Sequence, residues 1–358
     1  MSDKQNIRFL LGSNTKRGFV PLFDELREPV NGKRLYIIKG GPGSGKSSLM
    51  KKIAAALEEK KHSIEYFHCA SDPGSLDAFI DYDAKIAMMD GTAPHTMDPE
   101  YPGAYDVIIN MADCWDDTIL LENKGDIIPL SDTISTCHRM ASGCIRAAAA
   151  LLDNNMQLAA SYVNHDTIYA FTSKLLKKLN PGKAGKEKKR LLSAVSVGET
   201  VFFGETMEAL AGDIYVLPDM WGAASNLLLS ELNRAAAALG IERIICYCSI
   251  RTPDKIDHII FPSEVPSEGI AVTTANPFHS LRGDKQHIVE DLMHPIPKLE
   301  QEQMSLHLDK AKELIDIAGK HVQKAKLLHD DLEAFYIKAM DFSRIDTIYE
   351  KIMQEILN

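Results

Sequence analysis

Apolar runs alternate with amphipathic stretches along the chain, which predicts short buried strands alternating with helices. The apolar run at 35–38 predicts a strand, and residues 48–60 predict a helix with one apolar face. That face consists of Leu49, Ile53, Ala56 and Leu57. Strands that alternate with helices are typical of a parallel sheet that helices cover on both faces. We therefore expect an α/β protein.

The order of these elements repeats within the chain. The run at 35–38 returns as a similar run at 214–217, and the Asp-Thr-Ile-Tyr segment at 166–169 returns unchanged at 346–349. The offset between the matching segments is about 180 residues throughout, and small insertions account for its variation. The sequence therefore predicts a tandem duplication of one design.

We expect two repeats, residues 1–180 and 193–358, joined by a linker at 181–192. Pro and Gly in the linker break any helix, and a basic run follows them. That run consists of Lys186, Lys188, Lys189 and Arg190. We interpret it as a solvated connector rather than as a phosphate contact.

Each repeat follows one plan of strand, helix, strand, short helical turn, strand and long helical region. In the second repeat, apolar residues recur at intervals of three and four between residues 308 and 335. That spacing predicts one buried stripe, and residues 132–179 of the first repeat are also free of Pro. We expect long antiparallel helices packed as a hairpin in each repeat, with core packing favoured over partner binding.

A glycine-rich motif joins the first predicted strand to the first predicted helix. Residues 40–47 fit the pattern G-x-x-x-x-G-K-[ST], in which backbone N–H groups wrap a polyphosphate where the chain bends tightly. The predicted cofactor-binding residues are Gly40, Gly41, Pro42, Gly43, Ser44, Gly45, Lys46, Ser47 and Ser48. The motif predicts a P-loop NTPase fold, a three-layer parallel sheet that is tandemly duplicated, with a long α-helical hairpin ending each repeat.

Three side chains have expected roles with ATP and Mg²⁺ as cofactors. Lys46 is expected to reach the β and γ phosphates, and the Ser47 hydroxyl is placed to bind Mg²⁺. A second metal partner is expected at the end of a neighbouring buried strand, where Asp90 follows the apolar run at 86–89. The alternative for Asp90 is a simple helix or turn cap.

Hydrolysis also needs a group that activates or positions water. A Glu often follows the metal-binding Asp, but Gly91 occupies that position. We predict Lys46, Asp72 and His68 as catalytic residues, with Asp72 as the base and His68 behind it. Asp72 also begins a good turn sequence, so a turn carboxylate is the competing interpretation. Arg17 and Arg251 are the nearest candidates for an arginine finger.

The second repeat has lost the glycine-rich motif. Ser225 stands where the first repeat has Lys46, and Asp219 stands where it has Gly40. Because this Asp would face the phosphate position, we expect the second repeat to bind triphosphate poorly. Asn226 likewise replaces Ser47.

This loss provides an internal comparison between the repeats. In the second repeat, Cys248, Thr252 and Thr274 replace His68, Asp72 and Asp90. The latter three residues are lost together with the glycine-rich motif, so they are candidates for its chemistry. By contrast, three residues of the first repeat have counterparts in the second, and we interpret them as fold-supporting. They are Pro73, Asp77 and His95.

Composition and charge narrow the function classes. The chain has 40 Lys and Arg against 50 Asp and Glu, which gives a net charge of -10. Nonspecific electrostatic binding to nucleic acid is therefore not expected. No stretch approaches the length of a membrane span, so we expect a cytoplasmic protein with no membrane contact. The six cysteines form no CxxC pair, which favours reduced thiols.

The segments GGPGSGKSSLMKKI, EYFHCASDPGSLD and MDGTAPH, together with the tandem layout, resemble an uncharacterised bacterial family of duplicated P-loop ATP-binding proteins. The resemblance implies ATP binding and a P-loop fold and supplies no reaction. In that family the second repeat often resembles an intact P-loop as well. Ser225 and Asn226 depart from that pattern, which argues against two nucleotide sites.

The leading hypothesis is an Mg-dependent ATPase that uses only the first repeat. A small-molecule kinase that transfers the γ-phosphoryl group of ATP is an alternative, and so is a non-hydrolysing, nucleotide-gated interaction module. Residues 123–126 fit the guanine-reading pattern N-K-x-D, but their surroundings predict a helix rather than the end of a buried strand. Guanine specificity is therefore not favoured.

Overall fold

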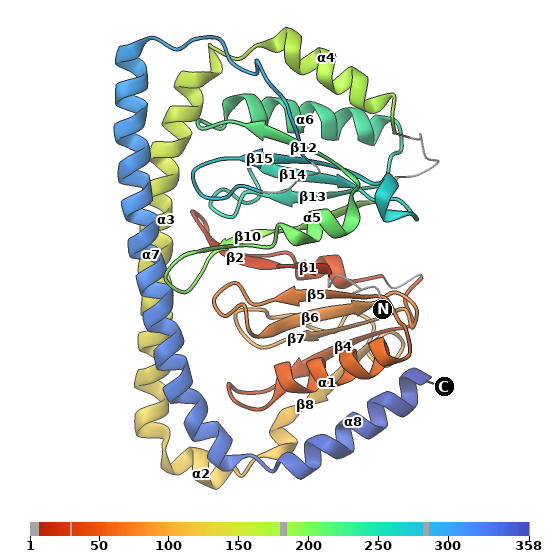
Figure 1. Cartoon of the computed structure of the whole chain (residues 1–358). Helices are drawn as coiled ribbons and strands as arrows, with labels where there is room; N and C mark the ends of the chain where they lie inside the picture. Colours follow the sequence, from red (N-terminus) through yellow and green to blue (C-terminus); the bar gives the residue numbers. More distant parts are fainter. Residues whose placement is uncertain (1–6, 29–30, 180–184, 282–285, 358) are drawn as a thin grey trace.

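The computed structural model describes residues 7–28, 31–179, 185–281 and 286–357. Two β-sheets lie one above the other, and two long helices run along one side of both sheets (Figure 1). The predicted linker lies partly outside the described residues, at 181–184.

The first sheet has six strands in the order β1-β5-β6-β7-β4-β8. Its strands are β1 (Ile7–Phe9), β4 (Arg34–Lys39), β5 (Ile64–His68), β6 (Leu76–Asp81), β7 (Ile86–Asp90) and β8 (Asp106–Asn110). The second sheet repeats this order as β9-β13-β14-β15-β12-β16. Its strands are β9 (Glu187–Arg190), β12 (Asp213–Pro218), β13 (Arg243–Tyr247), β14 (Ile256–Phe261), β15 (Ile270–Ala275) and β16 (Gln286–Ile288). The architecture is therefore a duplicated α/β fold.

The sheets are mixed, so the expectation of parallel sheets is wrong. Strand β6 pairs antiparallel with both β5 and β7, and β14 does the same between β13 and β15. Between the second and third predicted strands the repeat plan expected a short helical turn, but residues 76–81 of that segment form β6 instead. Leu76, Ala78 and Phe79 are all buried in the sheet, and such a short apolar segment satisfies its backbone hydrogen bonds best within a ladder.

The remaining strands form two small hairpins that lie between the sheets. They are β2 (Gly12–Thr15) with β3 (Gly18–Pro21), and β10 (Ser193–Val195) with β11 (Thr200–Phe202). The helices are α1 (Lys46–Glu59), α2 (Asp117–Glu122), α3 (Lys124–Ala160), α4 (His165–Leu176), α5 (Glu205–Leu210), α6 (Ala223–Ala238), α7 (Lys298–Ala339) and α8 (Phe342–Leu357). Short 3-10 helices occupy Phe23–Leu26, Met111–Cys114 and Pro266–Glu268.

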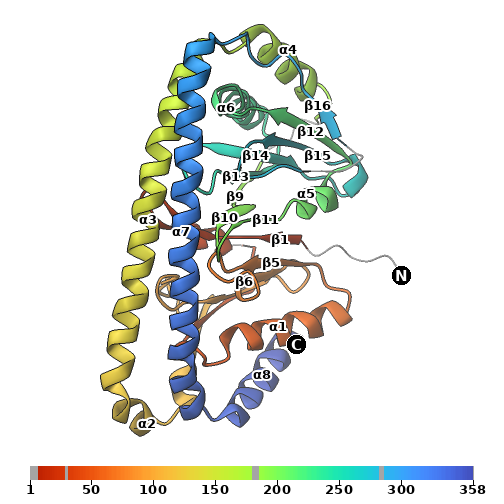
Figure 2. The same cartoon turned by 60° about the vertical axis from the view of Figure 1, so that its left-hand side comes forward.

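The long helices pair between the repeats, not within each repeat as the predicted hairpins required. Helix α3, of 37 residues, runs antiparallel to α7, of 42 residues (Figure 2). Buried Ile145 and Leu152 of α3 share a core with Leu308 and Ile315 of α7. The periodic stripe is thus buried as predicted, but against the other repeat. Among the described residues, no helix is long and apolar enough to cross a membrane.

The terminal helices α4 and α8 are exchanged between the two sheets. Ile168 and Leu175 of α4, from the first repeat, pack in one core with Leu228 and Leu232 of α6, from the second. Helix α8 packs in the same manner on α1. The long helix pair therefore carries the end of each repeat across to the sheet of the other (Figure 1).

The two repeats meet at an antiparallel bridge between the residues that directly follow β1 and β9. Leu10 and Leu191 exchange two backbone hydrogen bonds of 2.9 and 3.0 Å, and both side chains are fully buried. Beside them, Arg190 Nε donates to Glu65 Oε1 at 2.8 Å. The basic run is therefore not a solvated connector, because residues 187–190 form β9 and Arg190 is 1% exposed.

Glu65 and Arg190 form an ion pair that is buried on both sides, with side chains 3% and 1% exposed. Burial alone would raise the pKa of Glu65, but the Arg190 guanidinium outweighs it and leaves that pKa below its ordinary value. We expect Glu65→Gln to lower the free energy of unfolding by about 3–5 kcal/mol, because it leaves the buried guanidinium with only the more distant carboxylate of Glu25, 3.5 Å away, in the described part of the chain. Urea denaturation followed by circular dichroism measures this change.

Glu205→Gln is the matched control. Glu205 also pairs across the repeats, with Arg8, but the two side chains are 40% and 37% exposed, so we expect less than about 1 kcal/mol. Equal effects of the two substitutions would contradict the role given to the buried pair.

Candidate functional site

The glycine-rich loop at 40–47 joins β4 to α1 and bends where its glycines allow. Gly43 has a φ of 68° and Gly45 a φ of 83°, a left-handed conformation that side-chain-bearing residues rarely adopt. Two side chains hold the loop in place. Thr92, just after the end of β7, donates from its Oγ1 to Gly40 O at 2.8 Å, and Ser44 within the loop donates from its Oγ to Gly41 O at 2.7 Å. The loop ends at the N-terminus of α1, where backbone N–H groups favour an anion.

The predicted ligands Lys46, Ser47 and Asp90 come together at this loop. Lys46 Nζ lies 3.5 Å from Asp90 Oδ2 and donates to the carbonyl oxygens of Gly40 and Gly41 at 3.0 and 2.7 Å. Asp90 ends strand β7, which pairs directly with β4, as the apolar run predicted. Its Oδ1 accepts the Thr92 N–H at 2.8 Å, so the turn-cap alternative also describes part of its role.

These residues face a cavity of about 660 Å³. The loop and α1 supply one wall, including Pro42, Ser44 and Ser48. The opposite wall belongs to the other repeat: its residues are Ala325, Lys326, His329, Glu333 and Ile337 of α7, together with Phe342. Sequence reasoning missed this wall, because a periodic stripe identifies a buried face of a helix without identifying what packs against it.

The two residues predicted to act on water lie in different places. Asp72 lines the cavity, where its Oδ2 is 3.4 Å from Lys326 Nζ, and its Oδ1 accepts the Gly74 N–H at 3.2 Å. His68 is not among the residues lining this cavity. Its Nδ1 is 2.7 Å from Pro73 O, its ring packs on Phe203 of the other repeat, and burial lowers its pKa.

Asp77 and His95, which the comparison of repeats had set aside as fold-supporting, also line the cavity. His95 Nε2 lies 3.4 Å from Asp77 Oδ2. Burial raises the pKa of Asp77 to about 6, with His95 opposing the rise and Asp90 adding to it. A carboxyl group that titrates near neutral pH beside a cavity is suited to proton transfer.

The loop of the second repeat is filled by its own side chain. Asp219, the counterpart of Gly40, is 3% exposed. Its carboxylate accepts the N–H groups of Trp221, Gly222 and Ser225 at 3.2, 2.8 and 2.7 Å. A carboxylate thus takes the backbone donors that an intact loop offers to a phosphate.

Both arginine-finger candidates form ion pairs between the two repeats, away from the first-repeat cavity. Arg17 pairs with Asp254 and Arg251 pairs with Asp153, and neither lines the first-repeat cavity. The N-K-x-D segment at 123–126 lies where α2 ends and α3 begins. Its helical setting agrees with the interpretation from sequence.

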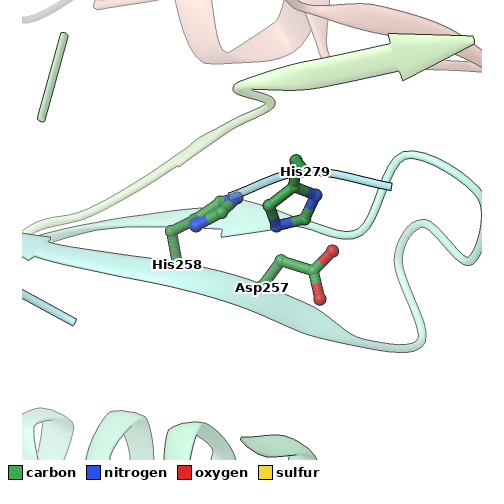
Figure 3. A group of neighbouring side chains, drawn as sticks. All are labelled: Asp257, His258 and His279. Atoms are coloured by element: carbon green, nitrogen blue, oxygen red, sulfur yellow. The ribbon is translucent and has the colours of Figure 1, made fainter. Parts of the chain in front are cut away.

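A buried trio of Asp257, His258 and His279 lies in the second repeat (Figure 3). The Lys255 ammonium is already paired with Asp257, and His279 Nε2 lies 3.0 Å from Thr274 Oγ1. His258 Nε2 is a buried ring nitrogen without a hydrogen-bond partner among the described residues. Because the Lys255 ammonium already balances the charge of Asp257, we assign the trio no metal.

The titration of Asp77 gives a testable dependence of stability on pH. The folded chain holds the Asp77 proton up to about pH 6, whereas the unfolded chain releases it near its ordinary pKa of 3.8. Between these values the folded state binds more protons, so the free energy of unfolding should fall as pH rises through this window. Asp77→Asn should remove that fall, as measured by urea denaturation from pH 4 to 7.

Asp98→Asn is the control, because the Asp98 side chain is 96% exposed. Its pH profile should run parallel to that of the wild type. Parallel profiles for wild type and Asp77→Asn would show instead that Asp77 ionises normally in the folded chain.

Comparison with known proteins gives a partial match. A model of the family described as Nephrocystin 3, N-terminal, matches residues 21–78, a segment that contains β4, the loop and α1. The match spans less than half of the chain and does not place the chain in that family. No curated protein and no solved structure matches the chain. The resemblance to a bacterial family of duplicated P-loop proteins therefore stays a prediction.

Proposed function

We propose that the chain binds Mg-ATP at residues 40–48 of the first repeat and hydrolyses it there. The observation that carries the proposal is the convergence of a glycine-bent loop, Lys46, Ser47 and Asp90 on one cavity of about 660 Å³. Backbone donors at a helix N-terminus with a Lys ammonium suit a polyphosphate. The choice of ATP over GTP rests on the family resemblance and on the helical setting of residues 123–126.

The donor set fits a hard divalent cation. The Ser47 hydroxyl and the Asp90 carboxylate are oxygen donors, which Mg²⁺ prefers, and both line the cavity. Bound Mg²⁺ would neutralise charge on the phosphates. Lys46 would bind and orient the phosphates, and it would have to leave the carbonyl oxygens of Gly40 and Gly41 to do so.

One nucleotide per chain is the proposed stoichiometry. The second loop has Ser225 in place of the lysine and holds the buried carboxylate of Asp219 on its backbone donors. A triphosphate there would have to displace a buried hydrogen-bonded carboxylate and would meet no lysine at that position.

Two alternatives follow from particular observations. Gly91 stands where hydrolases often have a Glu, and Asp72, Asp77 and His95 line the same cavity. That supply of carboxylates suits a small-molecule kinase, in which the γ-phosphoryl group goes to a metabolite hydroxyl. The wall supplied by α7 suits a non-hydrolysing module, in which nucleotide occupancy is transmitted to the helix pair.

We expect Lys46→Ala to weaken Mg-ATP binding by roughly 10- to 100-fold, because it removes a charge-assisted contact to the phosphates. Isothermal titration calorimetry measures the affinity. Lys60→Ala is the matched control, since Lys60 is exposed at the far end of the same helix, and it should bind as the wild type does. Equal affinity of all three proteins would refute the proposed site.

We expect Asp72→Asn to reduce turnover by roughly 10²- to 10⁴-fold while ATP affinity stays nearly unchanged, as loss of a general base requires. The assay follows radiolabelled γ-phosphate with and without cell extract. Phosphate release by the protein alone supports the ATPase. Label found on a metabolite only with extract supports the kinase, and tight binding with neither outcome supports the module. Unchanged turnover in Asp72→Asn would remove Asp72 from the mechanism.

A further inference from the structure

Helix α7 of the second repeat lies directly on the glycine-rich loop of the first. The Gly43 N–H donates to Glu333 Oε1 at 3.2 Å. A Cβ on Gly43 would lie 2.8 Å from the Glu333 carbonyl oxygen, and one on Gly41 would lie 2.3 Å from the Tyr336 ring. Glycine at these positions therefore permits the close approach of α7 as well as the bend of the loop.

The Glu333 carboxylate occupies a position that favours an anion. It accepts from a backbone N–H of the loop that, in the motif, faces phosphate oxygens. Its Oε1 is 3.5 Å from His329 Nδ1, and its side chain is 35% exposed. A carboxylate that is partly exposed and held by few contacts can be displaced at modest cost.

The second repeat supplies an internal comparison for this contact. There a carboxylate also lies on the loop donors, but it comes from Asp219 at the start of the same loop, accepts three N–H groups and is buried. In the first repeat Gly40 stands at the corresponding position, and the carboxylate comes from α7 instead. Both loops thus hold a carboxylate, one built into the loop and one supplied by a separate helix.

We propose that Glu333 holds the place of a nucleotide phosphate on the first-repeat loop, and that nucleotide binding expels this carboxylate and releases the end of α7 from the loop. The inference rests on the proposed function, because it names what nucleotide must displace at that same site. A triphosphate and Glu333 compete for the same donors and repel each other as like charges. Binding is therefore coupled to the contact between the two repeats.

Loss of the Glu333 contact would also alter the packing around Tyr336, three residues further along α7. Tyr336 packs edge-on against Trp115, with ring centroids 5.7 Å apart. Trp115 also forms an antiparallel bridge with Met340, at the end of α7. The ring of Trp115 therefore reports the position of this end of the helix.

The first test compares Mg-ATP affinity among variants by calorimetry. Glu333→Gln keeps the shape and an acceptor oxygen but removes the charge, so we expect binding roughly tenfold tighter than in wild type. Glu313→Gln is the matched control on the same helix, because Glu313 pairs with Lys310 on an exposed face. It should leave the affinity unchanged.

The outcomes distinguish failure of this inference from failure of the proposed Mg-ATP site. Tighter binding by Glu333→Gln alone supports the inference. Unchanged or weaker binding by Glu333→Gln, while Lys46→Ala still loses affinity, overturns the inference and leaves the nucleotide site in place. Absence of Mg-ATP binding in the wild type overturns both.

The second test needs no change at Glu333. In a Trp221→Phe chain, Trp115 is the remaining tryptophan of the two in the sequence, and addition of Mg-ATP should change its fluorescence emission. The same chain with Lys46→Ala should respond only at roughly 10- to 100-fold higher nucleotide concentration. Saturating Mg-ATP that binds by calorimetry without altering Trp115 emission would overturn the release of α7.

Discussion

The arrangement of the molecule depends on which helices bury the apolar faces of α1 and α6. Each of these helices packs on the sheet of its own repeat, and a terminal helix from the other repeat packs against it: α8 on α1 and α4 on α6. The α3–α7 pair carries these terminal helices across the molecule (Figure 1). Because burial of apolar surface is the main driving force of folding, the exchange makes each repeat dependent on the other, and it places α7 over the loop of the first repeat.

That dependence explains why a repeat without an intact glycine-rich motif remains useful. Ser225 and Asp219 remove the features that a phosphate site needs, yet the second repeat still provides one wall of the proposed nucleotide site through α7. Its own loop is stabilised by the three N–H groups that Asp219 accepts. The second repeat is thus a structural partner whose long helix α7 supplies Glu333, the residue that contacts the first-repeat loop.

The sequence was sufficient for features that depend on local pattern. The duplication, the strands at β4 and β7, the helix α1 and the position of Asp90 beside Lys46 all follow from apolar runs and motif spacing. Contacts between distant segments could not be predicted in this way. The direction of β6 depends on its neighbours in the sheet, and the burial of Arg190 depends on Glu65 in the other repeat. In isolation, a run such as 186–190 is typical of a solvated surface.

Positive groups and a loop N–H donor of the proposed site already have partners within the protein. A phosphate would therefore have to replace these partners instead of entering an unpaired positive pocket. Lys46 lies beside Asp90 and donates to loop carbonyl oxygens, Lys326 is paired with Asp72, and the Gly43 N–H is taken by Glu333. A phosphate would gain these donors only as their present partners give way, so affinity is set by the difference between the two sets of contacts. In a chain with a net charge of -10, an anion that cannot displace these partners would find these positive charges already paired at the proposed site. If the loop binds Mg-ATP as proposed, the carboxylates that weaken binding would also favour a ligand that brings its own cation and several phosphates.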